Sequence, residues 1–350
     1  MTNRPSRLAE YGWSQYFQSQ LSVAELAGSM PVRVFAVHRN RLDVAGPEFE
    51  GRVPFPAGDD DESHATIGDW LLVDRISGTP ERVLERKSLF KRKAAGSGRR
   101  VQLLAANVDT LFIVTSCNQD FNIARLERYL ALAREADVTP VIVLTKADLA
   151  DDARSFVTSA AKLMPGLLVE CLDARASEEA AILRPWCGVG DTVALVGSSG
   201  VGKSTLINTL TGGEIATAPI RDNDAHGRHT TSGRSLHRLA AGGWLMDTPG
   251  MRELQLTDAG EGIDDVFADI VALAATCRFA DCNHDSEPGC AVRAALEAGT
   301  LDGARLDRYR KLVREEAYNS EALHERHARN REFGRMIKRV MKAKPEKRGT

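Results

Sequence analysis

The order of two short runs constrains this chain more than any other feature of its 350 residues. The later run, GSSGVGKS at 197–204, matches the pattern G-x-x-x-x-G-K-[ST]. It follows an apolar stretch at 192–196 and opens a segment with helical character, which is the strand–loop–helix context of a phosphate-binding loop. The earlier run, TKAD at 145–148, also ends an apolar stretch. Both runs therefore predict loops at strand ends in a parallel α/β sheet with helices on both faces.

The later run predicts a phosphate site with a magnesium ion. Its glycines let backbone N–H groups turn onto phosphate oxygens, and the following helix adds its positive N-terminal end. We expect Lys203 to reach the β- and γ-phosphates as a catalytic cation, and the Ser204 hydroxyl to ligate Mg²⁺. The expected phosphate-loop contacts are Gly197, Ser198, Ser199, Gly200, Val201, Gly202, Lys203, Ser204 and Thr205.

Two more runs fit the same site. The run DTPG at 247–250 ends an apolar strand, so Asp247 is placed to hold Mg²⁺ through water and the Gly250 N–H to sense the γ-phosphate. The polar stretch 220–235 is typical of a mobile switch. Within it, either Thr230 or Thr231 is the candidate for a second magnesium ligand, and the sequence does not separate them.

The earlier run indicates which base is bound. The Asp148 carboxylate can accept hydrogen bonds from both guanine N1–H and the 2-amino group, a donor pair that adenine lacks. The Lys146 stem would lie along the base, next to Ala147. Thr145 stands where Asn is usual; it can donate and accept, but it reaches less far. Because the phosphate loop comes first in an ordinary GTPase, the reversed order predicts a circularly permuted P-loop GTPase domain.

The usual group that positions the attacking water is missing. Many GTPases place Gln directly after the D-x-x-G run for this purpose. Here the position holds Met251, whose thioether cannot do so. Intrinsic hydrolysis should be slow unless another group acts, and His229 in the switch stretch is the catalytic candidate by type and place.

A cluster near the C-terminal end predicts a structural zinc site. Three of the six cysteines of the chain gather there beside a histidine. Three thiolates and one imidazole suit tetrahedral Zn²⁺ with every position filled, and in a cytosolic chain such a cluster favours metal over disulfides. The expected ligands are Cys277, Cys282, His284 and Cys290.

The remaining sequence suggests a multi-domain chain. Five short strand patterns between residues 31 and 85, separated by turn residues, favour an OB-like barrel; a small β-domain that only packs on its neighbour is the alternative. Residues 86–100 are expected to form a flexible basic linker, and 326–348 a basic tail. The expected domains are an N-terminal arm at 1–30, the barrel at 31–95, the permuted GTPase domain at 96–252 and a mostly helical zinc-binding domain at 253–350.

Composition limits the partners. The net charge is −2, so nucleic-acid contact must come from local basic patches. No apolar run reaches the roughly 18 residues of a membrane span, and the first ten residues have no apolar signal core. We therefore expect a cytoplasmic monomer with no membrane partner.

Together, these runs resemble the ribosome small-subunit-dependent GTPase A family, which consists of circularly permuted bacterial GTPases. The motif order TKAD, GSSGVGKS, GRHTTS, DTPG is the family's order. The run GDW at 68–70 is similar to its barrel signature, QLLAANVD at 102–109 to the opening of its GTPase domain, and the Cys cluster to its zinc knuckle. Its second base-recognition run is matched only loosely, with Leu172-Asp-Ala174 nearest.

The resemblance implies a barrel of the OB type, GTP and GDP as ligands, and binding to the small (30S) ribosomal subunit and its rRNA late in maturation, with GTP hydrolysis stimulated by that subunit. Two other functions stay open. One is a P-loop ATPase, against which Asp148 argues. The other is an RNA-binding module with a vestigial nucleotide site, against which Lys203, Ser204 and Asp247 argue.

Overall fold

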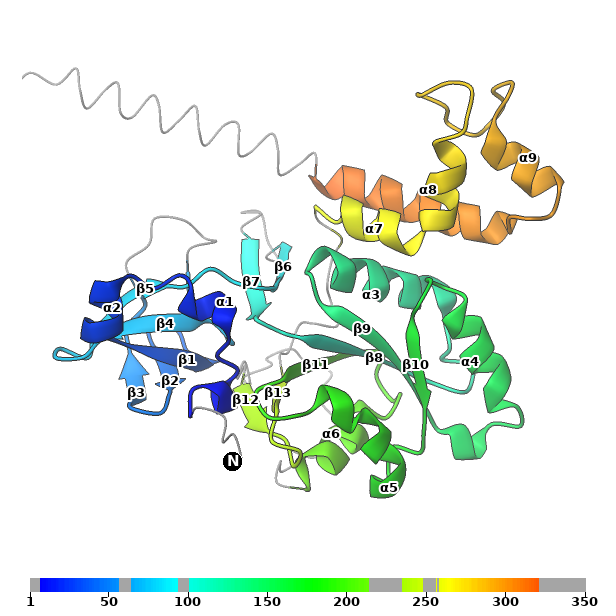
Figure 1. Ribbon diagram of the computed structural model, residues 1–350. Coiled ribbons are helices and arrows are strands. Elements are labelled where there is room, and N and C mark those ends of the chain that lie inside the picture. Colours follow the sequence, from blue (N-terminus) through cyan, green and yellow to red (C-terminus); the bar gives the residue numbers. More distant parts are fainter. Residues whose placement is uncertain are drawn as a thin grey trace, which may run out of the picture. The chain divides into compact units, whose positions relative to one another are not determined.

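The computed structural model describes residues 7–56, 64–93, 101–213, 235–247, 256 and 258–320 (Figure 1). The chain divides into two compact units. One comprises Met1–Gln255 with Glu261–Ala272, and the other Leu256–Gly260 with Leu273–Thr350. Within the described ranges, no helix combines the length and the apolar character needed to cross a membrane.

Five parallel strands form the centre of the first unit, as the apolar stretches predicted. They run in the order β10-β9-β8-β11-β13. Because β8 lies between β9 and β11, the loops after β9 and β11, which carry TKAD and GSSGVGKS, flank one another across the end of β8. The strands are β8 (Thr110–Ser116), β9 (Thr139–Thr145), β10 (Leu168–Cys171), β11 (Thr192–Val196) and β13 (Trp244–Asp247).

Helices cover both faces of these strands, and Figure 1 shows α3 and α6 on opposite sides. Phe112 and Val114 of β8 share a core with Leu206 and Leu210 of α6, while the alternate residues of β8 are buried on the other face. The α3 helix starts where the Asn122 side chain accepts the Arg125 N–H. The helices are α3 (Ile123–Glu135), α4 (Ala153–Ala161), α5 (Ser177–Ala180) and α6 (Lys203–Thr211), with the 3₁₀ turns η2 (Ala147–Leu149) and η3 (Ala181–Trp186).

Five antiparallel strands precede this sheet, in the order β3-β2-β1-β4-β5. They enclose an apolar core that includes Val32, Val44 and Leu71, so the strand pattern expected of the barrel is confirmed. A short N-terminal segment packs on it, with Phe17 only 1% exposed against Trp70. The elements are η1 (Ala9–Tyr11), α1 (Gln15–Gln18), α2 (Val23–Gly28), β1 (Ser29–Val37), β2 (Leu42–Ala45), β3 (Glu50–Val53), β4 (Trp70–Asp74) and β5 (Pro80–Val83).

The two sheets are continuous, which the sequence did not predict. Strand β12 (Ser235–Arg238) pairs with β13 on one side and with β1 on the other, at Ala36 opposite Ser235. A buried arginine of β1 closes the junction: Arg33 Nη1 lies 2.7 Å from Tyr11 O, and Nη2 lies 2.7 Å from Thr192 Oγ1 on β11. Burial lowers the pKa of Arg33 to about 10.

The expected basic linker is partly wrong. Strands β6 (Leu89–Lys93) and β7 (Val101–Ala106) pair antiparallel, so residues 89–93 belong to a hairpin. Arg86 pairs with a residue of the same unit and does not face solvent freely: its Nε and Nη2 lie 2.8 and 2.9 Å from the oxygens of Asp69, which is fully buried. Gly68 beside it has φ +86, and a Cβ there would come within 2.1 Å of Ala106 O.

The C-terminal region is helical where it is described, as expected. It contains α7 (Gly260–Val266), α8 (Ala268–Ala274), α9 (Ala291–Glu297) and a further helix over residues 303–320. The basic tail expected at 326–348 lies outside the described residues.

Candidate nucleotide-binding site and metal centre

The loop at 197–204 has the backbone of a phosphate loop. Gly197 has φ +146, and a Cβ on it would lie 2.1 Å from Val114 O, so no larger residue fits. Gly202 has φ +96, and α6 begins directly after it at Lys203. The helix N-terminus and the inward-turning backbone are the features that bind phosphate.

Lys203 lies inside this loop. It is only 7% exposed, and its Nζ donates to Gly197 O at 2.7 Å and to Ser198 O. A buried ammonium needs polar partners, which the loop carbonyls supply here. The Lys203 ammonium therefore lies inside the loop that would surround the phosphates, away from solvent. Ser204 and Thr205, in the first turn of α6, are exposed, so their hydroxyls are accessible to a ligand.

Thr145 joins the two loops of the site. Its side chain is fully buried, and Oγ1 lies 2.5 Å from Val201 O and 3.2 Å from Thr115 O. The hydroxyl therefore points at the phosphate loop. Its position at the end of an apolar strand was predicted from the sequence, but its partner on the phosphate loop was not.

Asp148 is held by an arginine that the sequence analysis missed. Arg175 Nη2 lies 2.7 Å from Asp148 Oδ2 and also contacts Asp173, whose carboxyl has a pKa lowered by that guanidinium. Lys146 before it has φ 58, a left-handed turn that opens η2.

The run 172–174, the loose match to a second base-recognition segment, thus lies beside Asp148. It is anchored on both sides. The Leu172 N–H donates to Leu144 O at 2.9 Å, and Thr209 Oγ1 of α6 donates to Ala174 O at 2.7 Å. Three loops, at 145–148, 172–175 and 197–204, therefore form one connected site.

The remaining residues expected at the nucleotide site are described only in part. Asp247 is the last residue of β13, which pairs with β11 at Met246 opposite Ala194, so its backbone lies next to the strand that feeds the phosphate loop. The expected site residues outside the described ranges are His229, Thr230, Thr231 and Gly250, as is Met251.

The four expected zinc ligands converge in the second unit. The ligand atoms of Cys277, Cys282, His284 and Cys290 all lie within 4.8 Å of one another. His284 Nδ1 is 3.6 Å from Cys277 Sγ and 3.5 Å from Cys290 Sγ, and the two sulfurs are 3.9 Å apart. Ligands about 2.0–2.3 Å from a tetrahedral zinc would be separated by roughly these distances, so the donor set fits the ion.

Two side chains shape the loop that carries His284. The Arg310 guanidinium donates to His284 O at 2.9 Å and to Asp285 Oδ1 at 2.9 Å. The Glu287 carboxylate accepts the N–H groups of Asn283 at 2.9 Å and of Asp285 and Ser286 at 3.0 Å, and these bonds lower its pKa to about 2. Hydrogen bonds of this kind, made to the loop around a metal ligand, help to fix the orientation of that ligand.

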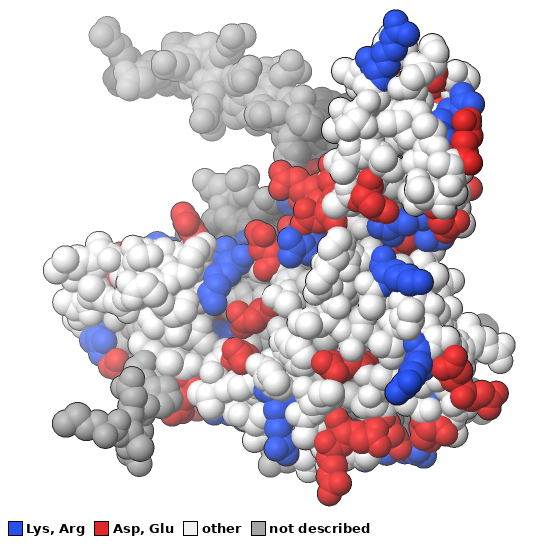
Figure 2. All heavy atoms as spheres, turned by 45° about the vertical axis from the view of Figure 1, so that its right-hand side comes forward, with Lys and Arg blue, Asp and Glu red and all other residues white. Residues whose placement is uncertain are grey.

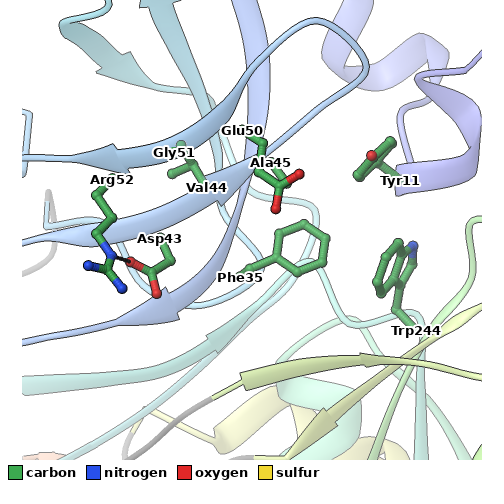
Figure 3. A pocket seen from close by; sticks show the side chains of 9 residues that line it. All are labelled: Tyr11, Phe35, Asp43, Val44, Ala45, Glu50, Gly51, Arg52 and Trp244. Carbon is green, nitrogen blue, oxygen red and sulfur yellow. Dashed lines mark ion pairs between the residues drawn. The ribbon is translucent and has the colours of Figure 1, made fainter.

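A pocket of about 430 Å³ lies where the N-terminal segment, the barrel and β13 meet (Figure 3). Trp244 forms its aromatic wall: its ring stacks on Tyr11 with centroids 5.9 Å apart and meets the Phe35 ring edge-on at 4.8 Å. Asp43 and Arg52, paired at 3.3 Å, line the opposite part. None of its lining residues belongs to the three nucleotide loops, so it is a separate feature.

Comparison with known proteins gives a consistent result. The RsgA GTPase family matches residues 83–257. The "Small ribosomal subunit biogenesis GTPase RsgA" of Mesorhizobium japonicum is 54% identical over 318 residues, covering 89% of this chain and 91% of that protein. "Small ribosomal subunit biogenesis GTPase RsgA 2" of Vibrio parahaemolyticus is 48% identical, covering 96% and 93%.

Solved structures agree on the fold. The crystal structure of YjeQ from Thermotoga maritima superposes with a TM-score of 0.61 at 26% identity, covering 81% of this chain and 97% of that one. YloQ, titled a circularly permuted GTPase, has a TM-score of 0.57 at 23% identity, covering 83% and 95%. These structures confirm the α/β fold, and the family match and the curated relatives confirm the GTPase activity expected from the motif order. The chain belongs to the RsgA GTPase family.

Proposed function

We propose that this GTPase acts on the small ribosomal subunit late in its maturation, as an assembly checkpoint whose GTP hydrolysis the subunit stimulates. The names of its relatives support the subunit as partner. The main support for a working nucleotide site is one hydrogen bond. The Thr145 hydroxyl lies 2.5 Å from Val201 O and so holds the proposed base-recognition loop against the phosphate loop. A vestigial site would have no need of a fully buried connection between these loops.

The site residues divide the work as follows. Asp148 accepts the guanine N1–H and 2-amino groups, and the loop at 197–205 with Lys203 binds the phosphates. Magnesium, when bound, neutralises charge on the β- and γ-phosphates; Ser204, Asp247 and Thr230 (or Thr231) would hold it. Gly250 senses the γ-phosphate, and His229 is the proposed group for the attacking water.

The zinc centre has a structural role in this proposal. Its four protein ligands leave no position for a substrate, and the loop around it is held by Arg310 and Glu287. The ion would therefore fix the shape of the second unit rather than take part in hydrolysis. The domains at 31–95, 96–252 and 253–350, after an arm at 1–30, are the proposed carriers of RNA binding, hydrolysis and zinc.

Ribosomal RNA is the proposed binding surface on the subunit. On the face shown in Figure 2, Lys and Arg side chains are interspersed with Asp and Glu rather than gathered in one patch. The basic segment 86–100 (apart from Arg86), the tail 326–348 and the barrel are the proposed contacts. If they bind phosphates, subunit affinity should fall steeply with salt, and an affinity unchanged by salt would reject this part. We propose a cytoplasmic monomer.

GTP turnover with and without purified small subunits tests the function. We expect a large rise with GTP and small subunits, and none with large subunits or with ATP. Lys203→Ala should abolish the stimulated rate. If the wild-type protein binds GTP tightly but small subunits leave its turnover unchanged, the activating partner is something else and the proposal fails.

A further inference from the structure

Arg175 is hydrogen-bonded to the Asp148 carboxylate, the group proposed to recognise guanine. Its Nη2 donates to Asp148 Oδ2 at 2.7 Å. The guanidinium is aimed there by Asp173, which lies 3.0 Å from Nε through Oδ1 and 2.8 Å from Nη2 through Oδ2. The Arg175 N–H also donates to Asp173 Oδ1 at 2.9 Å, so backbone and side chain are held by the same carboxylate.

The chemistry of the two partners of Asp148 is alike. Guanine presents an N1–H and a 2-amino group on one carbon, which is the arrangement of N–H donors in a guanidinium. Guanine recognition takes both carboxylate oxygens of Asp148, and Arg175 already holds Oδ2. Oδ2 has two lone pairs, but a guanidinium held on it crowds a second donor and weakens that donor's hydrogen bond, so we expect guanine to bind better once this contact is broken.

Displacement is easy because Arg175 has a second partner. Its side chain is 66% exposed, and Asp173 alone satisfies it in bidentate fashion. Moving away from Asp148 therefore leaves no buried or unpaired charge. The exchange weakens binding by an exposed ion pair, which in proteins amounts to a factor of about two to five.

We propose that Arg175 is an internal competitor for the guanine-recognition carboxylate, which lowers the affinity for GDP and GTP and accelerates nucleotide release. The inference rests on the guanine-recognition role proposed for Asp148. It makes Arg175 a specificity-determining residue of this site, acting only on nucleotides that need Asp148.

Nucleotide titrations of the full-length protein test the competition. Arg175→Ala and Arg175→Gln should bind fluorescent GDP about two- to fivefold more tightly and release it more slowly, because the competing ion pair is gone. Their affinity for ADP, which makes no such donor pair with Asp148, should stay at the wild-type value. Arg154→Ala, which removes an exposed arginine of α4, is the matched control and should change neither.

A second background separates direct competition from a general charge effect. Asp148→Asn exchanges the carboxylate for an amide, which can donate to the 2-oxo group of xanthine. In that background Arg175→Ala should leave the affinity for xanthosine diphosphate unchanged, because Arg175 has lost its charged partner. An equal tightening there would overturn the proposal, since it would show nonspecific electrostatics.

The two failures are distinguishable. If Asp148→Ala weakens GDP binding but Arg175→Ala weakens it too or leaves it unchanged, Arg175 supports the site and the competition is wrong. If Asp148→Ala leaves GDP affinity unchanged, the guanine-recognition role itself falls, and the competition falls with it.

Discussion

Replacing Thr145 with valine tests whether one buried hydroxyl connects the two loops of the nucleotide site. Valine keeps the shape of the side chain but removes the donor that lies 2.5 Å from Val201 O. Both residues are fully buried, so water cannot replace the lost hydrogen bond. A buried acceptor left without a donor destabilises by about 1–3 kcal/mol. If this free energy is lost from the nucleotide-binding arrangement of the two loops, GDP affinity drops roughly 5- to 150-fold.

Thr145→Ser is the matched control, because it keeps the hydroxyl and loses only a methyl group. Both variants should lose stability in urea unfolding, the serine through its small cavity. Only the valine variant should lose GDP affinity in a fluorescence titration. Equal GDP affinity of the valine variant and the wild-type protein would refute the reasoning, because the hydroxyl would then hold the fold without positioning the phosphate loop.

Three other substitutions probe the rest of the molecule. Arg33→Met removes the donors to Tyr11 O and the Thr192 hydroxyl, so it should lower the free energy of unfolding, measured in urea, by about 2–5 kcal/mol. A negligible loss would contradict a structural role of Arg33 at the junction of the two sheets. Cys290→Ser should abolish bound zinc, measured by atomic absorption, while GDP affinity stays unchanged; stoichiometric zinc in the variant would exclude this ligand. The hydrogen bond from Arg82 holds the pKa of Glu25 at about 2, below its unfolded value of about 4.3, so its stabilisation is present above that value and lost as pH falls towards 2. Glu25→Gln should therefore be less stable than wild type near neutral pH, with the difference shrinking over that acidic window, and a constant difference would contradict the assignment.

The strands and the site loops were predictable because each has a strong local signature. Apolar stretches such as 110–115 and 192–196 predicted parallel strands, since strands covered on both faces carry continuous apolar sequence. The Cys/His cluster expected to hold zinc was predictable from residue type and spacing alone, and the structure brings its ligand atoms within 4.8 Å of one another. In both cases the chemistry that directs the fold lies within a few residues.

The contacts between distant segments were not predictable. The basic composition of residues 86–100 suggested a solvated linker, but the fully buried Asp69, 17 residues earlier, holds the partly buried Arg86. The same applies to Arg175, which follows a weak motif and meets Asp148 only because β10 lies beside β9. Strand β12 follows a polar stretch without alternation, and its pairing with β1 depends on tertiary structure.

That pairing connects the barrel to the candidate nucleotide site through hydrogen-bonded strands. The hairpin of β12 and β13 is bounded by the candidate switch threonines on one side and by Asp247 on the other. It is hydrogen-bonded to β11, which carries the phosphate loop, and to β1 of the barrel. A strand cannot slip by one residue without turning its side chains to the wrong face, so the register of the hairpin and that of β1 are fixed together where Ala36 lies opposite Ser235. If the run 247–250 contacts the γ-phosphate as proposed, the nucleotide site and the barrel share one hydrogen-bonded path through β12 and β13.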